Sequence, residues 1–227
     1  MIRTVPNNGL LISPDDDENL NDVLNQGCWS PVEKISVQPA SEVQWRVDNI
    51  EAGESAFDVY YDNKCVGHVK WALSGKHNVS NALGAIAAAH HVGVSPQEAI
   101  AALATFQNVK RRMEVRAVIN DITLYDDFAH HPTAIASTLA GLRGKVGSQC
   151  IIAVLEPRSN TMKMGVHKAS LLPSLVDADM AMIYLPDELE WDMDLDAYPS
   201  IQTFNSIDQL IMAITSKAEA GNHVLFM

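Results

Sequence analysis

The chain has 227 residues, and 47% of them are apolar, which is enough for one large domain or two small domains with packed cores. The formal net charge of −12 argues against a nucleic-acid backbone as the main partner, because neutralising phosphates requires clustered lysines and arginines. A small anionic ligand is compatible with this charge, since a few local cations and a helix N-terminus can bind one phosphate group.

Nothing in the sequence predicts a membrane or secreted protein. No stretch approaches the roughly 18 to 20 apolar residues of a membrane span, and the N-terminus lacks the basic and then apolar layout of a signal peptide. Cys28, Cys65 and Cys150 are far apart and form no C-x-x-C pair, which is typical of reduced thiols in a core. We therefore expect a cytoplasmic protein.

The first 73 residues are irregular, with a short buried strand expected at 9–13 and an acidic turn after it. Residues 56–73 alternate on both sides of "YDNK" and predict an antiparallel hairpin with Phe57, Val59 and Tyr61 on one face.

Two helices are expected next, over residues 78–93 and 95–106. The first has alanines and aliphatics at helical spacing and ends at a glycine. In the second, Ser95, Pro96 and Glu98 occupy the N-cap, N1 and N3 positions, which together form a capping box.

From about residue 110, strands alternate with helices, and the strands are nearly continuous apolar runs. This pattern predicts an α/β fold with a mostly parallel sheet that is covered on both faces. Residues 118–127 fit either a strand pair or one long strand. The other expected strands are 149–157, 180–186 and 223–227, and the expected helices are 132–144, 163–179 with an interruption near Pro173, and 206–222.

Polar side chains follow three of these strands, in the segments "DDFAHH", "EPRSNTMK" and "PDE". Because ligands of open parallel sheets bind outside the carboxyl ends of the strands, we expect a ligand site at this edge.

The segment "YDDFAHHP" at this edge contains two carboxylates and two imidazoles. Adjacent Asp126 and Asp127 point to opposite sides of a continuing strand, which weakens a paired acid and base mechanism. His131 would cap a helix that begins at Pro132. Adjacent histidines share a metal poorly, and the sequence has neither H-E-x-x-H nor paired cysteines, so a structural zinc site is not expected.

Three other segments allow both a binding and a structural interpretation. Asn78 and Asn81 lie three residues apart and could bind an adenine edge, or Asn78 could cap the helix. The cations of "VKRRME" could clamp a phosphate or form a solvated surface. The donors of the segment after residue 157 could bind a carboxylate or phosphate or form a polar turn; they are Arg158, Ser159, Asn160, Thr161 and Lys163.

A phosphate-binding P-loop is not present in these residues. Gly75 and Lys76 would require glycine at position 70 and serine or threonine at 77, which are Lys70 and His77.

Five stretches together resemble the Mur ligase family, the ATP-dependent ligases of bacterial cell-wall peptides. They extend over most of the chain from Gly27 to about Lys168. The combination of "KRRMEV", "YDDFAHHPTAI" and "EPRSNTMK" is specific. The stretches are "GCWSPVE", "WALSGKHNVSNALGAIAAA", "NVKRRMEV", "YDDFAHHPTAI" and "VLEPRSNTMKMGVHK".

The resemblance implies a role for individual residues. Asn78 and Asn81 match a family element that contacts adenine. Arg112 and Asp127 match family positions that lie at the ATP nucleotide. His130 matches the histidine of the same strand-end motif. Arg158, Ser159, Asn160, Thr161 and Lys163 occupy the loop that receives the incoming peptide.

The resemblance also implies domains and a reaction. Residues 1–109 would be the end of a central ATPase domain, and residues 110–227 a Rossmann-like C-terminal domain truncated at its end. The implied enzyme uses ATP and Mg²⁺ to join UDP-N-acetylmuramate to the murein tripeptide L-alanyl-γ-D-glutamyl-meso-diaminopimelate through an acyl phosphate, in peptidoglycan recycling.

Several family features are not found in these residues, namely the phosphate loop, most magnesium ligands, the UDP-sugar domain and a glycine-rich stretch after the last strand. We therefore expect this chain alone to be inactive. Two alternatives remain open at this stage. One is a ligase with L-alanine as acceptor, and the other is a non-catalytic module that binds nucleotide or peptide.

Overall fold

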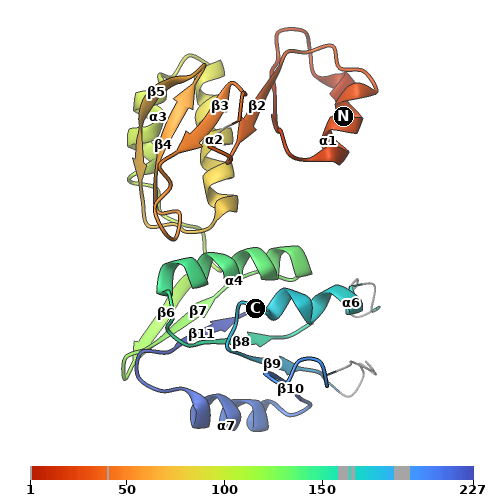
Figure 1. Cartoon of the computed structure of the whole chain (residues 1–227), viewed down its shortest axis with the longest axis vertical. Helices are drawn as coiled ribbons and strands as arrows, with labels where there is room; N and C mark the ends of the chain where they lie inside the picture. The colour runs from red at the N-terminus through yellow and green to blue at the C-terminus, as the bar shows by residue number, and fades with distance from the viewer. Residues whose placement is uncertain (1, 40, 158–163, 165–166, 187–194) are drawn as a thin grey trace. The chain divides into compact units, whose positions relative to one another are not determined.

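The computed structural model describes residues 2–39, 41–157, 164, 167–186 and 195–227 (Figure 1). The chain divides into two compact units, Met1–Gln107 and Asn108–Met227. Within the described residues, no helix combines the length and hydropathy that crossing a membrane requires.

The first unit contains a five-stranded sheet in the order β1-β2-β3-β4-β5, parallel from β1 to β3 and antiparallel from β3 to β5. Its strands are β1 Leu11–Pro14, β2 Val32–Ser36, β3 Trp45–Asp48, β4 Ala56–Tyr61 and β5 Lys64–Lys70. Its helices are the 3-10 turn η1 Ile2–Thr4, α1 Glu18–Asn25, α2 Lys76–His91 and α3 Pro96–Leu103.

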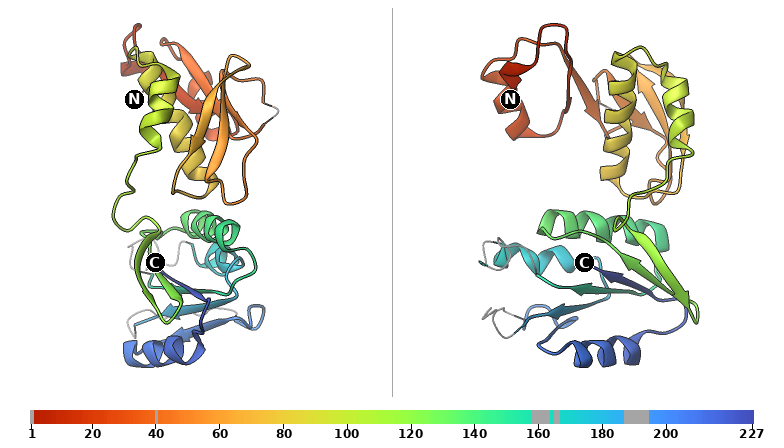
Figure 2. Two further views of the ribbon diagram at one scale, coloured as in Figure 1. Left: turned by 90° about the vertical axis from the view of Figure 1, so that its left-hand side faces the viewer. Right: turned by 180° about the vertical axis from the view of Figure 1, so that it is seen from behind.

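Helices α2 and α3 cover one face of this sheet (Figure 2), and their apolar side chains form its core with the strands. The predicted hairpin is confirmed, with Phe57 and Val59 fully buried and Tyr61 packed against the same cluster. Asp62 and Asn63 have φ of 45° and 63° in the connecting turn, which are the angles that a two-residue type I′ hairpin turn requires.

The predicted start of α3 and the predicted glycine after α2 are confirmed, whereas α2 begins at Lys76 and α3 ends at Leu103. Ser95 and Glu98 form the expected capping box at the start of α3. Gly93 has a φ of 95° directly after the C-cap of α2, a conformation that glycine adopts without a steric penalty.

The predictions for the first 50 residues were less successful. The expected strand is present as β1, but Ser13 is its one buried residue. The acidic turn instead begins α1, because the side chain of Asp17 accepts a hydrogen bond from Leu20 N at 2.9 Å. Strands β2 and β3 were not predicted.

The second unit contains a six-stranded sheet in the order β10-β9-β8-β11-β7-β6, in which every neighbouring pair is parallel except β6 and β7. Its strands are β6 Glu114–Ile119, β7 Ile122–Asp126, β8 Ile151–Leu155, β9 Met180–Tyr184, β10 Ile201–Phe204 and β11 His223–Phe226. Its helical segments are α4 Pro132–Val146, α6 Lys168–Leu171, the 3-10 turn η2 Pro173–Leu175 and α7 Ile207–Lys217.

This sheet is covered on both faces, as expected for the α/β class. Helices α4 and α6 lie on one face and α7 lies on the other (Figure 1), and each face has its own buried cluster. All five residues of β8 are buried, because β8 lies between β9 and β11. The region that was expected to be either a strand pair or one long strand is a strand pair, formed by β6 and β7. In the turn that connects them, Asn120 and Asp121 have φ of 51° and 63°. Strand β10 was not predicted.

The three cysteines are free, as expected. The interpretation as core thiols is wrong for Cys65, which is exposed near the beginning of the edge strand β5, while Cys28 and Cys150 are half-buried.

Candidate functional site

The polar segments that follow β7 and β8 leave the second sheet at the same edge. β11 lies between these two strands and is parallel to both. At its end, Phe226 O accepts a hydrogen bond from Asp127 N at 2.9 Å, and Met227 O accepts one from Glu156 N at 3.0 Å. The prediction that these strand ends share an edge is therefore confirmed.

Asp127 follows β7 and has a buried carboxylate, with 4% of the residue exposed. Its Oδ2 accepts a hydrogen bond from Met113 N at 2.8 Å, and its Oδ1 accepts one from Ala129 N at 2.8 Å and one from Thr138 Oγ1 at 3.4 Å. One carboxylate thus connects the segment before β6, the turn after β7 and helix α4. Because both oxygens already accept hydrogen bonds within the protein, this arrangement favours a structural contribution of Asp127 to the site.

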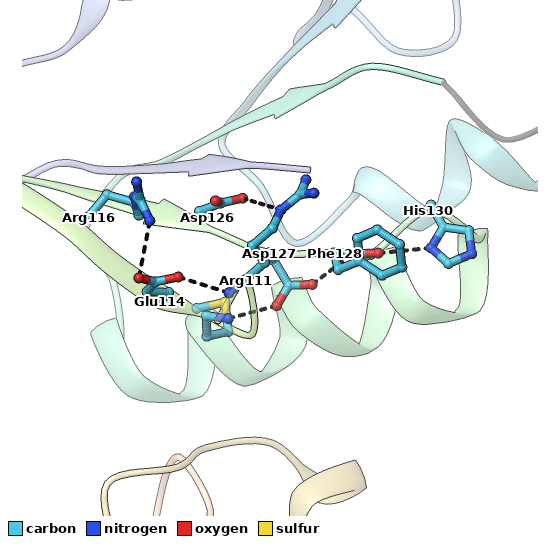
Figure 3. Close-up of polar contacts among 9 residues, drawn as sticks. Arg111, Glu114, Arg116, Asp126, Asp127, Phe128 and His130 are labelled. Atoms are coloured by element: carbon cyan, nitrogen blue, oxygen red, sulfur yellow. Dashed lines mark hydrogen bonds and ion pairs between the residues drawn. The ribbon is translucent and has the colours of Figure 1, made fainter. Parts of the chain in front are cut away.

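Asp126 points away from Asp127, as the alternation along a strand predicts (Figure 3). Its Oδ1 forms an ion pair with Arg111 Nε at 3.4 Å, and both side chains are partly exposed. Arg111 has a φ of 58°, and its N–H donates to Glu114 Oε2 at 2.9 Å. This backbone hydrogen bond, helped by the charge of nearby Arg116, lowers the pKa of Glu114.

Phe128 is 47% exposed, and its ring contacts three nitrogen-containing side chains. The guanidinium carbons of Arg111 and Arg112 lie 5.3 Å and 5.8 Å from the ring centroid. The His130 ring meets the Phe128 ring edge-on at 4.9 Å, and both side chains are drawn in Figure 3. The sequence prediction did not include Phe128. An aromatic residue between a carboxylate and two histidines at a strand end was the pattern that could have drawn attention to it.

Arg112 differs from its neighbour in one respect. Within the described part of the chain, its guanidinium has no carboxylate partner, whereas Arg111 pairs with Asp126. An exposed guanidinium without a counter-ion can bind phosphate or carboxylate oxygens through two parallel hydrogen bonds. Arg112 is thus the cation of this corner that is best suited to an anionic ligand.

The two histidines have separate contacts. His130 Nδ1 lies 2.8 Å from Phe128 O, and because a carbonyl can only accept, Nδ1 donates the proton. His131 is the N-cap of α4, as predicted, and its Nδ1 accepts from Thr133 N at 3.3 Å. The ring of His131 also meets that of His167 at 4.3 Å. Among the described residues, no three His, Cys, Asp or Glu side chains form a group that could bind a metal ion.

Asn78 and Asn81 lie in the first unit, on the first turns of α2. The N-cap of α2 is Gly75 rather than Asn78, so the capping interpretation is wrong. Asn78 instead donates from Nδ2 to Ser74 O at 2.7 Å, while Asn81 is exposed.

The predicted peptide-binding residues Arg158, Ser159, Asn160, Thr161 and Lys163 lie outside the described residues.

Two protein-family models match this chain. The model of the Mur ligase middle domain matches residues 1–89, and the model described as Mur ligase, glutamate ligase domain, matches residues 111–227. The chain belongs to the Mur ligase family. The resemblance inferred from the five sequence stretches is confirmed.

Three individual proteins show to which Mur ligases this chain is similar. The UDP-N-acetylmuramate–L-alanyl-γ-D-glutamyl-meso-2,6-diaminoheptandioate ligase of Escherichia coli K12 is 45% identical over 100% of this chain and 50% of its own length. The crystal structure of a murein peptide ligase from Psychrobacter arcticus 273-4 has 42% identity and a TM-score of 0.71, covering 100% of this chain and 49% of its own. A UDP-N-acetylmuramate–L-alanine ligase of Caldanaerobacter subterraneus is 33% identical over 68% of this chain and 34% of its own length. The chain therefore spans about half the length of the first two proteins.

Proposed function

We propose that this chain forms part of an ATP-dependent ligase that joins UDP-N-acetylmuramate to the tripeptide L-alanyl-γ-D-glutamyl-meso-diaminopimelate. The observation that carries this proposal is the 45% identity, along all of this chain, to a ligase whose name states these two substrates. The identity to the ligase named for L-alanine is lower, at 33%, which favours the tripeptide as acceptor.

The reaction joins a carboxylate to an amine, and ATP would supply the phosphoryl group that activates the carboxylate as an acyl phosphate. We propose that Arg112 binds phosphate oxygens of the nucleotide. Its exposed guanidinium, without a carboxylate partner among the described residues, fits an anionic group. Stabilising negative charge on transferring phosphate is the contribution that such a cation makes to phosphoryl transfer.

We propose that His130 lies at the same nucleotide, because it is exposed and its ring contacts the Phe128 ring that also contacts Arg112. Its Nδ1 proton is used by Phe128 O, which leaves Nε2 for the ligand. Asp127 would act on the nucleotide indirectly, through the backbone that it fixes at Met113 and Ala129.

The remaining site residues are assigned by the family resemblance. Asn78 and Asn81 would contact adenine, to which carboxamides can both donate and accept hydrogen bonds. The donors of the segment after β8 would bind the incoming peptide, whose diaminopimelate and γ-linked glutamate carry free carboxylates. These donors are Arg158, Ser159, Asn160, Thr161 and Lys163.

Among the described residues, no three His, Cys, Asp or Glu side chains form a group that could hold Mg²⁺ by itself, although Mg²⁺ usually binds through one or two carboxylates together with substrate phosphates. No step is therefore assigned to a metal bound by this chain. The 227 residues also contain no G-x-x-x-x-G-K-[ST] pattern. For these reasons we predict that the 227-residue chain assayed alone with ATP, UDP-N-acetylmuramate and tripeptide forms no product.

A ligase assay of the protein encoded by the complete reading frame that contains this chain tests the proposal. UDP-N-acetylmuramate and ATP are supplied with either the tripeptide or L-alanine, and the products are identified by mass spectrometry. Product with the tripeptide supports the proposed function, and product with L-alanine alone supports the other ligase. Binding of ATP without any product would indicate a non-catalytic nucleotide-binding module.

A further inference from the structure

Phe128 is a large apolar side chain in a polar corner. It lies between two buried residues, Asp127 and Ala129, yet it is itself 47% exposed. A single exposed apolar side chain is common on protein surfaces and needs no explanation by itself. Phe128 is unusual because charged and polar side chains contact its ring.

Two guanidinium groups lie within the distance at which cations interact with an aromatic face. Their central carbons are 5.3 Å and 5.8 Å from the ring centroid, inside the usual limit of about 6 Å. Such contacts are favourable because the ring face carries partial negative charge.

The two arginines depend on the ring to different extents. Arg111 is also held by its ion pair with Asp126. For Arg112, no ion pair is found among the described residues, and the Phe128 ring lies 5.8 Å from its guanidinium carbon. Removing the ring would therefore release Arg112 more than Arg111.

The backbones of both partners are fixed by the same buried group. Asp127 accepts a hydrogen bond from Met113, the residue after Arg112, and another from Ala129, the residue after Phe128. The ring and the guanidinium thus extend from two backbone segments that one carboxylate holds together.

We propose that Phe128 is a positioning residue, whose ring orients the Arg112 guanidinium for binding phosphate oxygens of the nucleotide. This inference rests on the proposed function, because it explains how that site is organised before the ligand binds. A guanidinium that is already oriented loses less conformational freedom on binding, so the ring contributes to nucleotide affinity.

The kinetic test compares Phe128→Leu, which removes the aromatic face, with Phe128→Tyr, which retains it. In the ligase assay of the protein from the complete reading frame, F128L is expected to raise the KM for ATP about twofold to fivefold, with little change in kcat. F128Y should stay within about twofold of the wild-type KM. F106L is the matched control, because Phe106 is similarly exposed at 50% and no guanidinium of the described residues is found over its ring.

A second measurement does not require turnover. In NMR spectra of the 227-residue chain, the side-chain protons of Arg112 should show a ring-current shift that F128L abolishes and F106L leaves unchanged.

The inference is overturned if the Arg112 protons of the wild type resonate at unshifted positions, or if F128L and the wild type have the same KM for ATP. An equal rise in KM for F128L and F128Y would also contradict it. An assay in which the wild type forms no product with either acceptor would instead count against the proposed function. The NMR experiment would then still decide whether the ring orients Arg112.

Discussion

The carboxylate of Asp127 accepts a hydrogen bond from the backbone N–H of Met113 at 2.8 Å, across 14 positions of the sequence. It also accepts from Ala129 N and Thr138 Oγ1, and the residue is 4% exposed. The corner that carries Arg112 is therefore fixed by a buried charged group rather than by packing alone.

Replacing Asp127 with alanine should destabilise the second unit. The substitution leaves the buried N–H of Ala129 and the partly buried N–H of Met113 without an acceptor, which is expected to cost about 2 to 3 kcal/mol. Urea unfolding of D127A and the wild type, followed by circular dichroism, measures the difference. The control is D126N, because Asp126 is partly exposed and its pair with Arg111 is worth about 0 to 1 kcal/mol. Equal effects of the two variants would contradict the structural role of Asp127.

Asp179 predicts a pH dependence of stability. Burial raises its pKa, but the hydrogen bond from Ile151 N–H and the pairing with Arg143 outweigh burial and lower the pKa overall. A group with a lowered folded-state pKa stabilises the protein above its unfolded-state pKa, and the stabilisation is lost as the pH falls through the folded-state pKa.

We therefore expect D179N to lower the free energy of unfolding at pH 7 by about 1 kcal/mol, a modest value because Asp179 is half-exposed. The difference should disappear between about pH 5 and pH 2. Urea unfolding at pH 7 and pH 3 measures it. D177N is the control, since no hydrogen bond or ion pair of the Asp177 side chain is found among the described residues. A difference that persists at the lower pH would refute this explanation.

Two glycines of the first unit should respond in opposite directions to alanine. A Cβ at Gly67 would lie 2.8 Å from Cδ1 of the buried Ile100, so G67A should destabilise the unit by about 1 to 3 kcal/mol. Gly84 lies inside α2, and apart from the backbone of that helix an added Cβ would meet no atom of the described residues within 4 Å, so G84A should stabilise α2 by about 0.5 to 1 kcal/mol. Thermal unfolding of both variants tests the pair, and a loss of stability in G84A would be inconsistent with the packing of α2.

The sequence was most informative where short-range interactions determine the structure. The capping box of Ser95 and Glu98 lies within four consecutive residues, and so does the turn at Asp62 and Asn63. Both were predicted correctly because each depends on neighbours along the chain. The alternation of β8, β9 and β11 with helices was also recognisable, since fully buried strands are continuous apolar runs.

Short strands were missed where pairing partners supply the stabilisation. β3 has four residues, of which Trp45 and Val47 are fully buried. Two buried positions are too few to distinguish alternation from chance. They become a strand because β3 pairs with β2 on one side and β4 on the other.

The sequence predicts where the candidate site lies, but not the contacts that its residues make. The polar segments after strands located the edge, and the family resemblance pointed to Arg112, Asp127 and His130. That Asp127 is buried could not be inferred, because its partners Met113 and Thr138 lie 14 and 11 positions away. The contact of the Phe128 ring with Arg112 likewise depends on a fold that brings two distant segments together.

Substitution of Arg112 is the sharpest test of whether this residue binds the phosphates of ATP in the ligase reaction. In the protein from the complete reading frame, Arg112→Met should lower kcat/KM for ATP about tenfold or more, since charge-assisted hydrogen bonds are worth about 1.5 to 3 kcal/mol. Arg116→Met is the matched control, because Arg116 is exposed but pairs with Glu114 at 3.1 Å. We expect R116M to stay within about twofold of the wild type. An unchanged kcat/KM in R112M, or an equal loss in both variants, would contradict it.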